Sequence, residues 1–164
     1  MVNSIETLVE INNDEGLLWE KIERFTDFLK SKEETILHHT DKMEEVFPLK
    51  HHIEDGLYTR ELFMPKGMIV VSFIHKQNHP SFFMKGDLSI ITEKGDISRI
   101  QAPKVVQTKI GTQRIAYTHT DCVWVCVYKV ESETVEEAEK EVYTEDFRML
   151  PESLIKELEL CQEY

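Results

Sequence analysis

Residues 65–92 read PKGMIVVSFIHKQNHPSFFMKGDLSIIT and contain three short β-rich runs separated by turn residues. The runs are Gly67–His75, Ser81–Met84 and Leu88–Thr92. Between them, residues 77–80 and Gly86-Asp87 supply the Gly, Pro, Asn and Asp that tight turns require. Short strands in close succession, with no helical segment between them, indicate an antiparallel β-sandwich or β-barrel.

The same alternation of short runs and turns extends over residues 46–130. The further runs are Leu57–Met64, Ile97–Ala102, Val105–Ile110, Arg114–Thr118 and Cys122–Val130. We therefore predict that residues 46–130 form a mainly β domain.

Both flanks of this β region have the periodicity of amphipathic helices. From Asp14 to about Lys32, apolar residues recur at helical spacing, and Asp14 is placed to cap the first turn. Two further helices are predicted at Thr134–Val142 and Pro151–Gln162, the second with Leu154, Ile155 and Leu158 on one face. Residues 1–45 are thus expected to form an amphipathic helix and a linker, and residues 131–164 an acidic helical extension.

The order of residues in the β region resembles the two motifs of the cupin superfamily, whose members fold as small jelly-roll barrels. The residues that carry the resemblance are Gly67, His75, His79 and Gly86 for the first motif, and residues 109–114 (KIGTQR) after Pro103 for the second. The resemblance covers about Leu57–Val130. Within the superfamily, the chain resembles in particular the small cupin-like proteins of tailed bacteriophages. It implies a mainly β, cupin-type jelly-roll barrel with helical extensions at both ends. For a phage protein, the resemblance also implies that the protein acts in the cytoplasm of the infected host.

The metal-binding residues of the cupin motifs are only partly present. The family's His pair is separated by one residue, whereas His75 and His79 are four apart and can meet only if the turn between them folds back. No Glu lies between His79 and Gly86, and Arg114 stands at the position of the family's third His. A guanidinium is not a metal ligand. Three roles therefore stay open for the two histidines: ligands of a divalent transition metal, contacts to a bound molecule, or structural residues.

Arg114 is expected on the inner face of the barrel if it points as the family's His does. A buried cation must be paired or must meet an anion. One interpretation is an internal ion pair with Glu61, and the other is a site for a small anionic molecule, because a guanidinium binds carboxylate and phosphate with two parallel hydrogen bonds. By strand alternation, Ala116 and Thr118 would face inward with Arg114, and His119 would face outward.

The charge distribution excludes some partners. The formal net charge of −12 divides into −5 for residues 1–34, +2 for residues 35–130 and −9 for residues 131–164. A mostly negative surface disfavours duplex nucleic acid and anionic membranes. The chain also has no Walker loop, dinucleotide-binding fingerprint, G-x-S-x-G or H-E-x-x-H motif.

A cytoplasmic location is expected from three features. No apolar run approaches the roughly 18 residues that span a bilayer. Residues 1–10 contain two Glu and no basic residue, unlike a signal peptide. Cys122, Cys126 and Cys161 are too few for a disulfide framework, and the first two are expected to be buried thiols.

The runs Ile69–Ile74 and Val123–Tyr128 are apolar on both faces, so both faces must be covered. The flanking helices cover part of this area, and we predict that a second copy of the chain covers the rest in a homodimer.

Three functions follow from these observations. The first is non-catalytic binding of a small anionic molecule at the barrel mouth by Arg114, His75, His79 and Glu61. The second is a metal-dependent cupin enzyme of the isomerase or dioxygenase type, with His75 and His79 as metal ligands. The third is a structural or interaction protein of a bacteriophage that uses the barrel as a scaffold.

Overall fold

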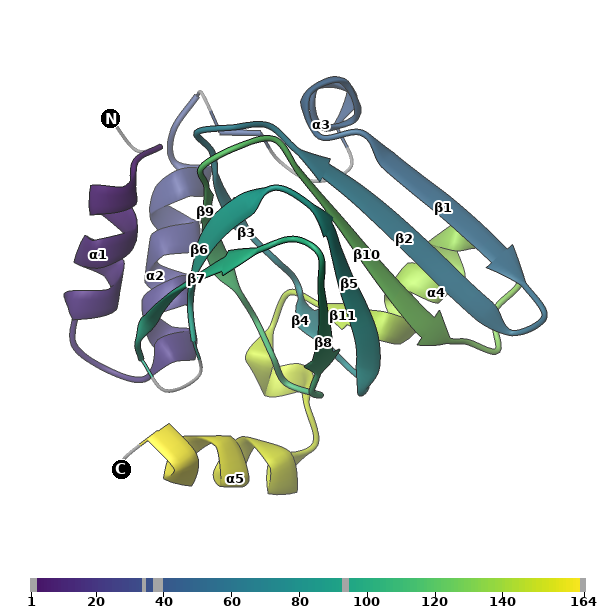
Figure 1. Ribbon diagram of the computed structural model, residues 1–164. Helices are drawn as coiled ribbons and strands as arrows, with labels where there is room; N and C mark the ends of the chain where they lie inside the picture. The colour runs from purple at the N-terminus through teal and green to yellow at the C-terminus, as the bar shows by residue number, and fades with distance from the viewer. Residues whose placement is uncertain (1–2, 34, 37–39, 93–94, 163–164) are drawn as a thin grey trace.

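The computed structural model describes residues 3–33, 35–36, 40–92 and 95–162. It is mainly β with helices at both ends (Figure 1), as predicted. The strands are β1 Leu49–Glu54, β2 Leu57–Met64, β3 Ile69–Val71, β4 Ile74–His75, β5 His79–Lys85, β6 Asp87–Ile91, β7 Ile97–Gln101, β8 Lys104–Thr108, β9 Ile115–Thr118, β10 Cys122–Lys129 and β11 Tyr143–Thr144. The helices are α1 Ile5–Asn13, α2 Leu18–Lys30, α3 Asp41–Val46, α4 Val135–Val142 and α5 Glu152–Gln162, with a 3₁₀ turn, η1, at Phe147–Met149.

Nine of the described strands form two antiparallel sheets packed face to face, in the orders β1-β2-β10-β5-β8 and β3-β9-β6-β7, and β4 pairs with β11 in a third, two-stranded sheet. Apart from β1, this is the strand order of a jelly roll, so the predicted fold is confirmed. Between the sheets lies a core built around Phe83, Leu88 and Cys122. Gly86, with φ +103°, joins β5 to β6, and a Cβ there would lie 2.6 Å from the Asp121 carbonyl oxygen. This glycine therefore allows the chain to cross between the sheets close to the start of β10.

The N-terminal region contains two helices where the sequence predicted one. Asp14 ends α1, where its N–H donates to the Ile11 carbonyl, so the predicted N-cap role of Asp14 is wrong. The helix α2 begins at Leu18, and the Glu20 carboxylate accepts a hydrogen bond of 2.8 Å from the Leu17 N–H. The predicted linker also contains the short helix α3, which begins after the capping side chain of Thr40.

The helices α1 and α2 lie side by side over the outer face of the four-stranded sheet (Figure 1). Ile22 and Phe25 of α2 pack there on Ile115 and Tyr117, whereas Ala116 belongs to the core between the sheets. The predicted alternation along β9 is therefore correct. The helices also explain why β3 is apolar on both faces, because one face meets the core and the other meets α1 and α2.

The C-terminal region joins the β domain through β11, which pairs with β4 by matching Tyr143 with His75. The predicted helices correspond to α4 and α5. The face of α5 formed by Leu154, Ile155 and Leu158 packs on Ile74, Phe147 and Leu150. Cys122 and Cys126 are buried free thiols, as expected, and the side chain of Cys161 lies outside the described residues. None of the described helices is both long and apolar enough to cross a membrane.

Candidate functional site

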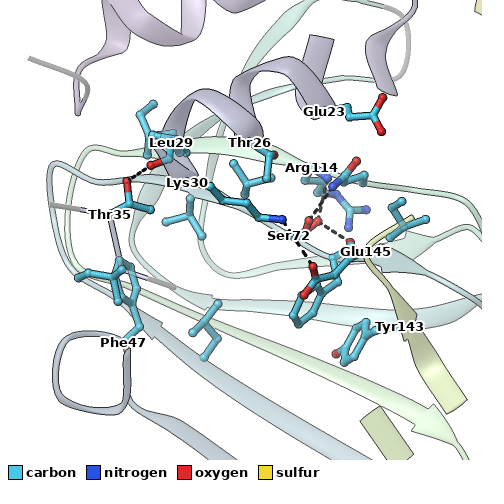
Figure 2. Close-up of a pocket in the computed structure, with 18 of the residues that line it drawn as sticks. Glu23, Thr26, Leu29, Lys30, Thr35, Phe47, Ser72, Arg114, Tyr143 and Glu145 are labelled. Carbon is cyan, nitrogen blue, oxygen red and sulfur yellow. Dashed lines mark hydrogen bonds and ion pairs between the residues drawn. The ribbon is translucent and has the colours of Figure 1, made fainter. Parts of the chain in front are cut away.

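A cavity of about 720 Å³ lies between α2, α3, the inner faces of β2, β3 and β10, and the segment from β11 to η1. Figure 2 shows side chains from these elements converging on it, with Arg114 and Tyr143 on one side and Phe47 on the other. Its size is within the range of small-molecule sites in proteins. The cavity is therefore the candidate functional site.

Arg114 lines this cavity and stands at the residue before β9. Its backbone N–H donates to the Ser72 hydroxyl at 2.8 Å, which fixes the backbone beside β3. Its guanidinium donates to the Thr108 hydroxyl at 3.1 Å and lies 5.7 Å from the centre of the Trp124 ring. These contacts hold the cation against the inner surface of the barrel.

Glu61 does not join Arg114. It lies on the outer face of β2, where its carboxylate forms an ion pair of 2.7 Å with Lys50 of β1. Its side chain is 37% exposed and does not line the cavity. The predicted pair of Glu61 with Arg114 is wrong because the strand presents the even-numbered residues to the interior.

Arg60 is a cavity residue that the sequence motifs did not identify. It lies on the inner face of β2, with its side chain only 11% exposed and its guanidinium 5.5 Å from the centre of the Tyr143 ring. The Glu139 carboxylate of α4 lies 3.8 Å from its Nε and offsets part of the cost of burying this charge. The alternation of Tyr58, Arg60 and Leu62 along the strand was the available signal, but alternation alone does not say which face is buried.

His75 and His79 come together, because the turn after β4 folds His79 back toward the barrel. Their ring centres are 4.6 Å apart, and both side chains are buried. His75 Nδ1 forms a hydrogen bond of 3.1 Å with the Tyr128 hydroxyl, and His79 Nδ1 forms one of 3.1 Å with the Gln77 carbonyl oxygen. His75 lines the cavity, whereas His79 is not among its lining residues.

Both imidazoles are neutral at pH 7. Burial lowers the pKa of His75 well below its ordinary value, and the neighbouring His79, Arg114 and Arg60 add to this effect. Burial also lowers the pKa of His79 to about 4, partly opposed by its hydrogen bond to the Gln77 carbonyl. Next to the histidine pair, the positive charge is therefore carried by the guanidiniums of Arg60 and Arg114.

The histidine pair does not fit a resident metal ion. Zinc and similar ions in proteins are held by three or four side chains. Among the described residues, no group of three or more His, Cys, Asp or Glu is arranged to hold a metal. His79 Nε2 is buried without a hydrogen-bond partner, but a single free nitrogen beside His75 does not complete a ligand set. The two imidazoles therefore supply at most two of the ligands that such an ion needs.

One wall of the cavity is formed where α2 contacts the C-terminal segment. Trp19 stacks on Phe147 with ring centres 4.9 Å apart and planes 2° from parallel. Two ion pairs, Arg148–Glu23 at 2.9 Å and Lys30–Glu145 at 3.7 Å, join the same two elements, and the second appears as a dashed line in Figure 2. These four charged residues line the cavity and pair with one another across this wall.

No protein-family model and no curated protein matches the sequence. Solved structures similar to the chain include ectoine synthase from P. lautus, which is 11% identical with a TM-score of 0.48 over 66% of this chain and 88% of that chain. Another is the cupin domain of an XRE-family transcriptional regulator from Enterobacter cloacae, 8% identical with a TM-score of 0.43 over 53% of this chain and 99% of that domain. A third is a cupin superfamily protein from Desulfitobacterium hafniense, 9% identical with a TM-score of 0.41 over 49% and 72% of the two chains.

At these identities and TM-scores the likenesses say nothing about activity, and the jelly-roll assignment rests on the strand order of the two sheets.

Proposed function

We propose that this protein binds a small anionic molecule in its cavity without transforming it, with Arg114 as the main anchor. The observation that carries the proposal is the position of the Arg114 guanidinium on the wall of a 720 Å³ cavity, with Arg60 on the same cavity. Cations removed from bulk water favour an anionic partner, and the planar donors of Arg suit carboxylate and phosphate groups. The neutral His75 beside them supplies a polar group without repelling the anion.

Several charged residues that line the cavity pair with one another. Four of the described acidic residues line the cavity, and three of them form ion pairs: Glu23 and Asp146 with Arg148, and Glu145 with Lys30. The fourth is Asp27. Arg60 forms an ion pair with Glu139, which lies on α4. Arg60 and Arg114 thus lie on the inner surface of the cavity, while three carboxylates at its rim pair with Arg148 and Lys30.

Binding is favoured over catalysis by the titration of the groups in the site. General acids and bases work best with pKa values near the operating pH. Here burial lowers the pKa of His75 and raises the pKa values of Tyr128 and Tyr143 above their ordinary value. None of these groups is poised to exchange a proton near pH 7. The metal-dependent enzyme would need further ligands beside His75 and His79.

The test is a thermal-shift and calorimetric screen of small carboxylates and phosphates against the protein and its Arg114→Gln variant. Loss of a charge-assisted hydrogen bond should weaken binding roughly 10- to 100-fold. Arg99→Gln is the matched control, because Arg99 pairs with Asp87 on the surface and does not line the cavity. Equal binding by the protein and by both variants would show that Arg114 does not contribute to ligand binding.

A further inference from the structure

We propose that the ligand is an amphipathic carboxylate, in which an anionic head is joined to a flexible alkyl tail. This inference rests on the proposed function and adds the chemical class of the ligand. It follows from the polar and apolar residues that line the cavity, of which Figure 2 shows Arg114 and Tyr143 on one side and Phe47 on the other.

The polar end brings together donors for a carboxylate. The guanidiniums of Arg60 and Arg114 line it, as does the hydroxyl-bearing ring of Tyr143. Tyr143 is 8% exposed, and its hydroxyl oxygen is buried without a hydrogen-bond partner in the structure. A buried hydroxyl without a partner costs free energy that an acceptor in the cavity would recover. A carboxylate oxygen is such an acceptor.

The apolar end lies where α3 covers the end of β2. Its lining is contributed by Met43, Phe47, Leu62, Met64 and Met68. All five belong to, or pack against, the hydrophobic core between the two sheets. An alkyl tail bound here would add to that core. Like the core side chains, the tail would be removed from water.

Three methionines at this end indicate the kind of tail. Met43, Met64 and Met68 have long, unbranched and polarisable side chains that adapt to a flexible partner. Such a surface suits an alkyl chain of variable length better than a rigid ring system. The compact polar end, by contrast, fixes the position of the head.

The experiment measures the affinity of a series of straight-chain carboxylates, from acetate through hexanoate to decanoate, by titration calorimetry. Each buried methylene should tighten binding by about fourfold until the apolar end is filled. Decanol, which lacks the charge, should bind roughly 10-fold or more weakly than decanoate. Inorganic phosphate serves as a second anionic probe without a tail.

Two variants separate the ends of the cavity. Met68→Gln should weaken decanoate binding at least fivefold and leave acetate binding unchanged, whereas Arg114→Gln should weaken all carboxylates by the same factor. Met84→Gln is the matched control, because Met84 is 57% exposed and lies away from the cavity.

The outcomes distinguish the proposal of an alkyl-tailed ligand from the proposal of anion binding on which it rests. Acetate or phosphate binding as tightly as decanoate, with loss in Arg114→Gln, would overturn the alkyl tail and leave anion binding intact. Decanoate and decanol binding equally would overturn the anionic head. Failure of every probe to bind would overturn both proposals.

Discussion

His75 and His79 illustrate at the scale of single residues how burial sets charge. The two rings lie 4.6 Å apart in the interior, next to the cationic Arg114, and both have lowered pKa values. Protonating either ring would place a third charge near the guanidiniums of Arg60 and Arg114. The folded protein therefore holds both rings neutral under conditions in which an unfolded chain would protonate them.

This predicts a pH dependence of stability. Between pH 6.5 and about 4 the unfolded chain binds a proton at His79 that the folded chain refuses, so the free energy of unfolding falls as the pH falls through this window. The pKa shift of His79 corresponds to a loss of about 3 kcal/mol across the window, and His75 acts in the same direction. Urea denaturation at pH values from 7 to 4 measures it.

The matched variants are His79→Asn and His52→Asn. Asparagine at position 79 keeps a donor for the Gln77 carbonyl but removes the titrating ring, so the pH dependence should become smaller. His52 lies on the surface, with its side chain 69% exposed, so His52→Asn controls for the loss of a histidine outside the interior. An identical dependence in His79→Asn would contradict the assignment.

Arg60 and Glu61 mark the limit of sequence reasoning at this scale. Alternation correctly divides β2 into two faces, but both faces carry polar residues, so the pattern does not identify the inner one. What decides is the pairing of Lys50 with Glu61 across β1 and β2 and the approach of Glu139 from α4. Neither contact is readable from local spacing.

At the scale of elements, the contact of α2 with the C-terminal segment shapes the cavity. Phe147 is 6% exposed and stacks on Trp19, and both rings line the cavity. The accompanying ion pairs are at the surface, where such pairs contribute little. The stacked rings should therefore supply most of the free energy of this contact.

Phe147→Ala should lower the free energy of unfolding by about 3 kcal/mol, the usual cost of removing a buried aromatic ring. It should also weaken ligand binding, because it removes part of the cavity wall. Phe28→Ala on α2 is the control, since Phe28 is 45% exposed, and its cost should stay below about 1 kcal/mol. Chemical denaturation measures the free energy of unfolding of both variants. Equal losses would show that the contact between Trp19 and Phe147 adds little to stability.

The elements that could be predicted are those bounded by local signals. The strand β2 and the helices α4 and α5 follow from hydrophobic periodicity and from the turns or caps at their ends. The strand β1 was missed because its central residues are polar and its pairing with β2 alone makes it a strand. The two-residue β11 was missed because it exists only through its pairing with β4. The cavity depends on these long-range contacts, which explains why Tyr143 and Phe147 were absent from the expected site.

At the scale of the whole molecule, the outer face of the five-stranded sheet bears on the predicted homodimer. Across this face, Glu61, Val125, Phe82 and Val105 stand opposite one another on neighbouring strands. Val105 is 61% exposed, and Lys50 with Glu61 forms a charge pair at the β1 side of the row. In a dimer with two-fold symmetry, the same surface of each copy forms the interface. A row with an apolar part and a charge pair can pack in this way against the same row of a second copy.

The homodimer prediction is tested by light scattering at micromolar concentration. The protein should have twice the mass of one chain, and Val105→Glu should halve it by placing like charges opposite each other. Lys104→Glu is the control, because it introduces the same charge on the neighbouring residue, whose side chain points to the other face of the strand. A monomeric protein would contradict the prediction.

The central claim is that a small anion occupies the cavity through Arg114. Native mass spectrometry of the purified protein, compared with its mass after denaturation, tests this claim most directly. The account predicts a small organic mass that is lost on denaturation, that is present in Arg99→Gln and that is absent in Arg114→Gln. A bare chain, or an excess mass equal to one transition-metal ion, would contradict it.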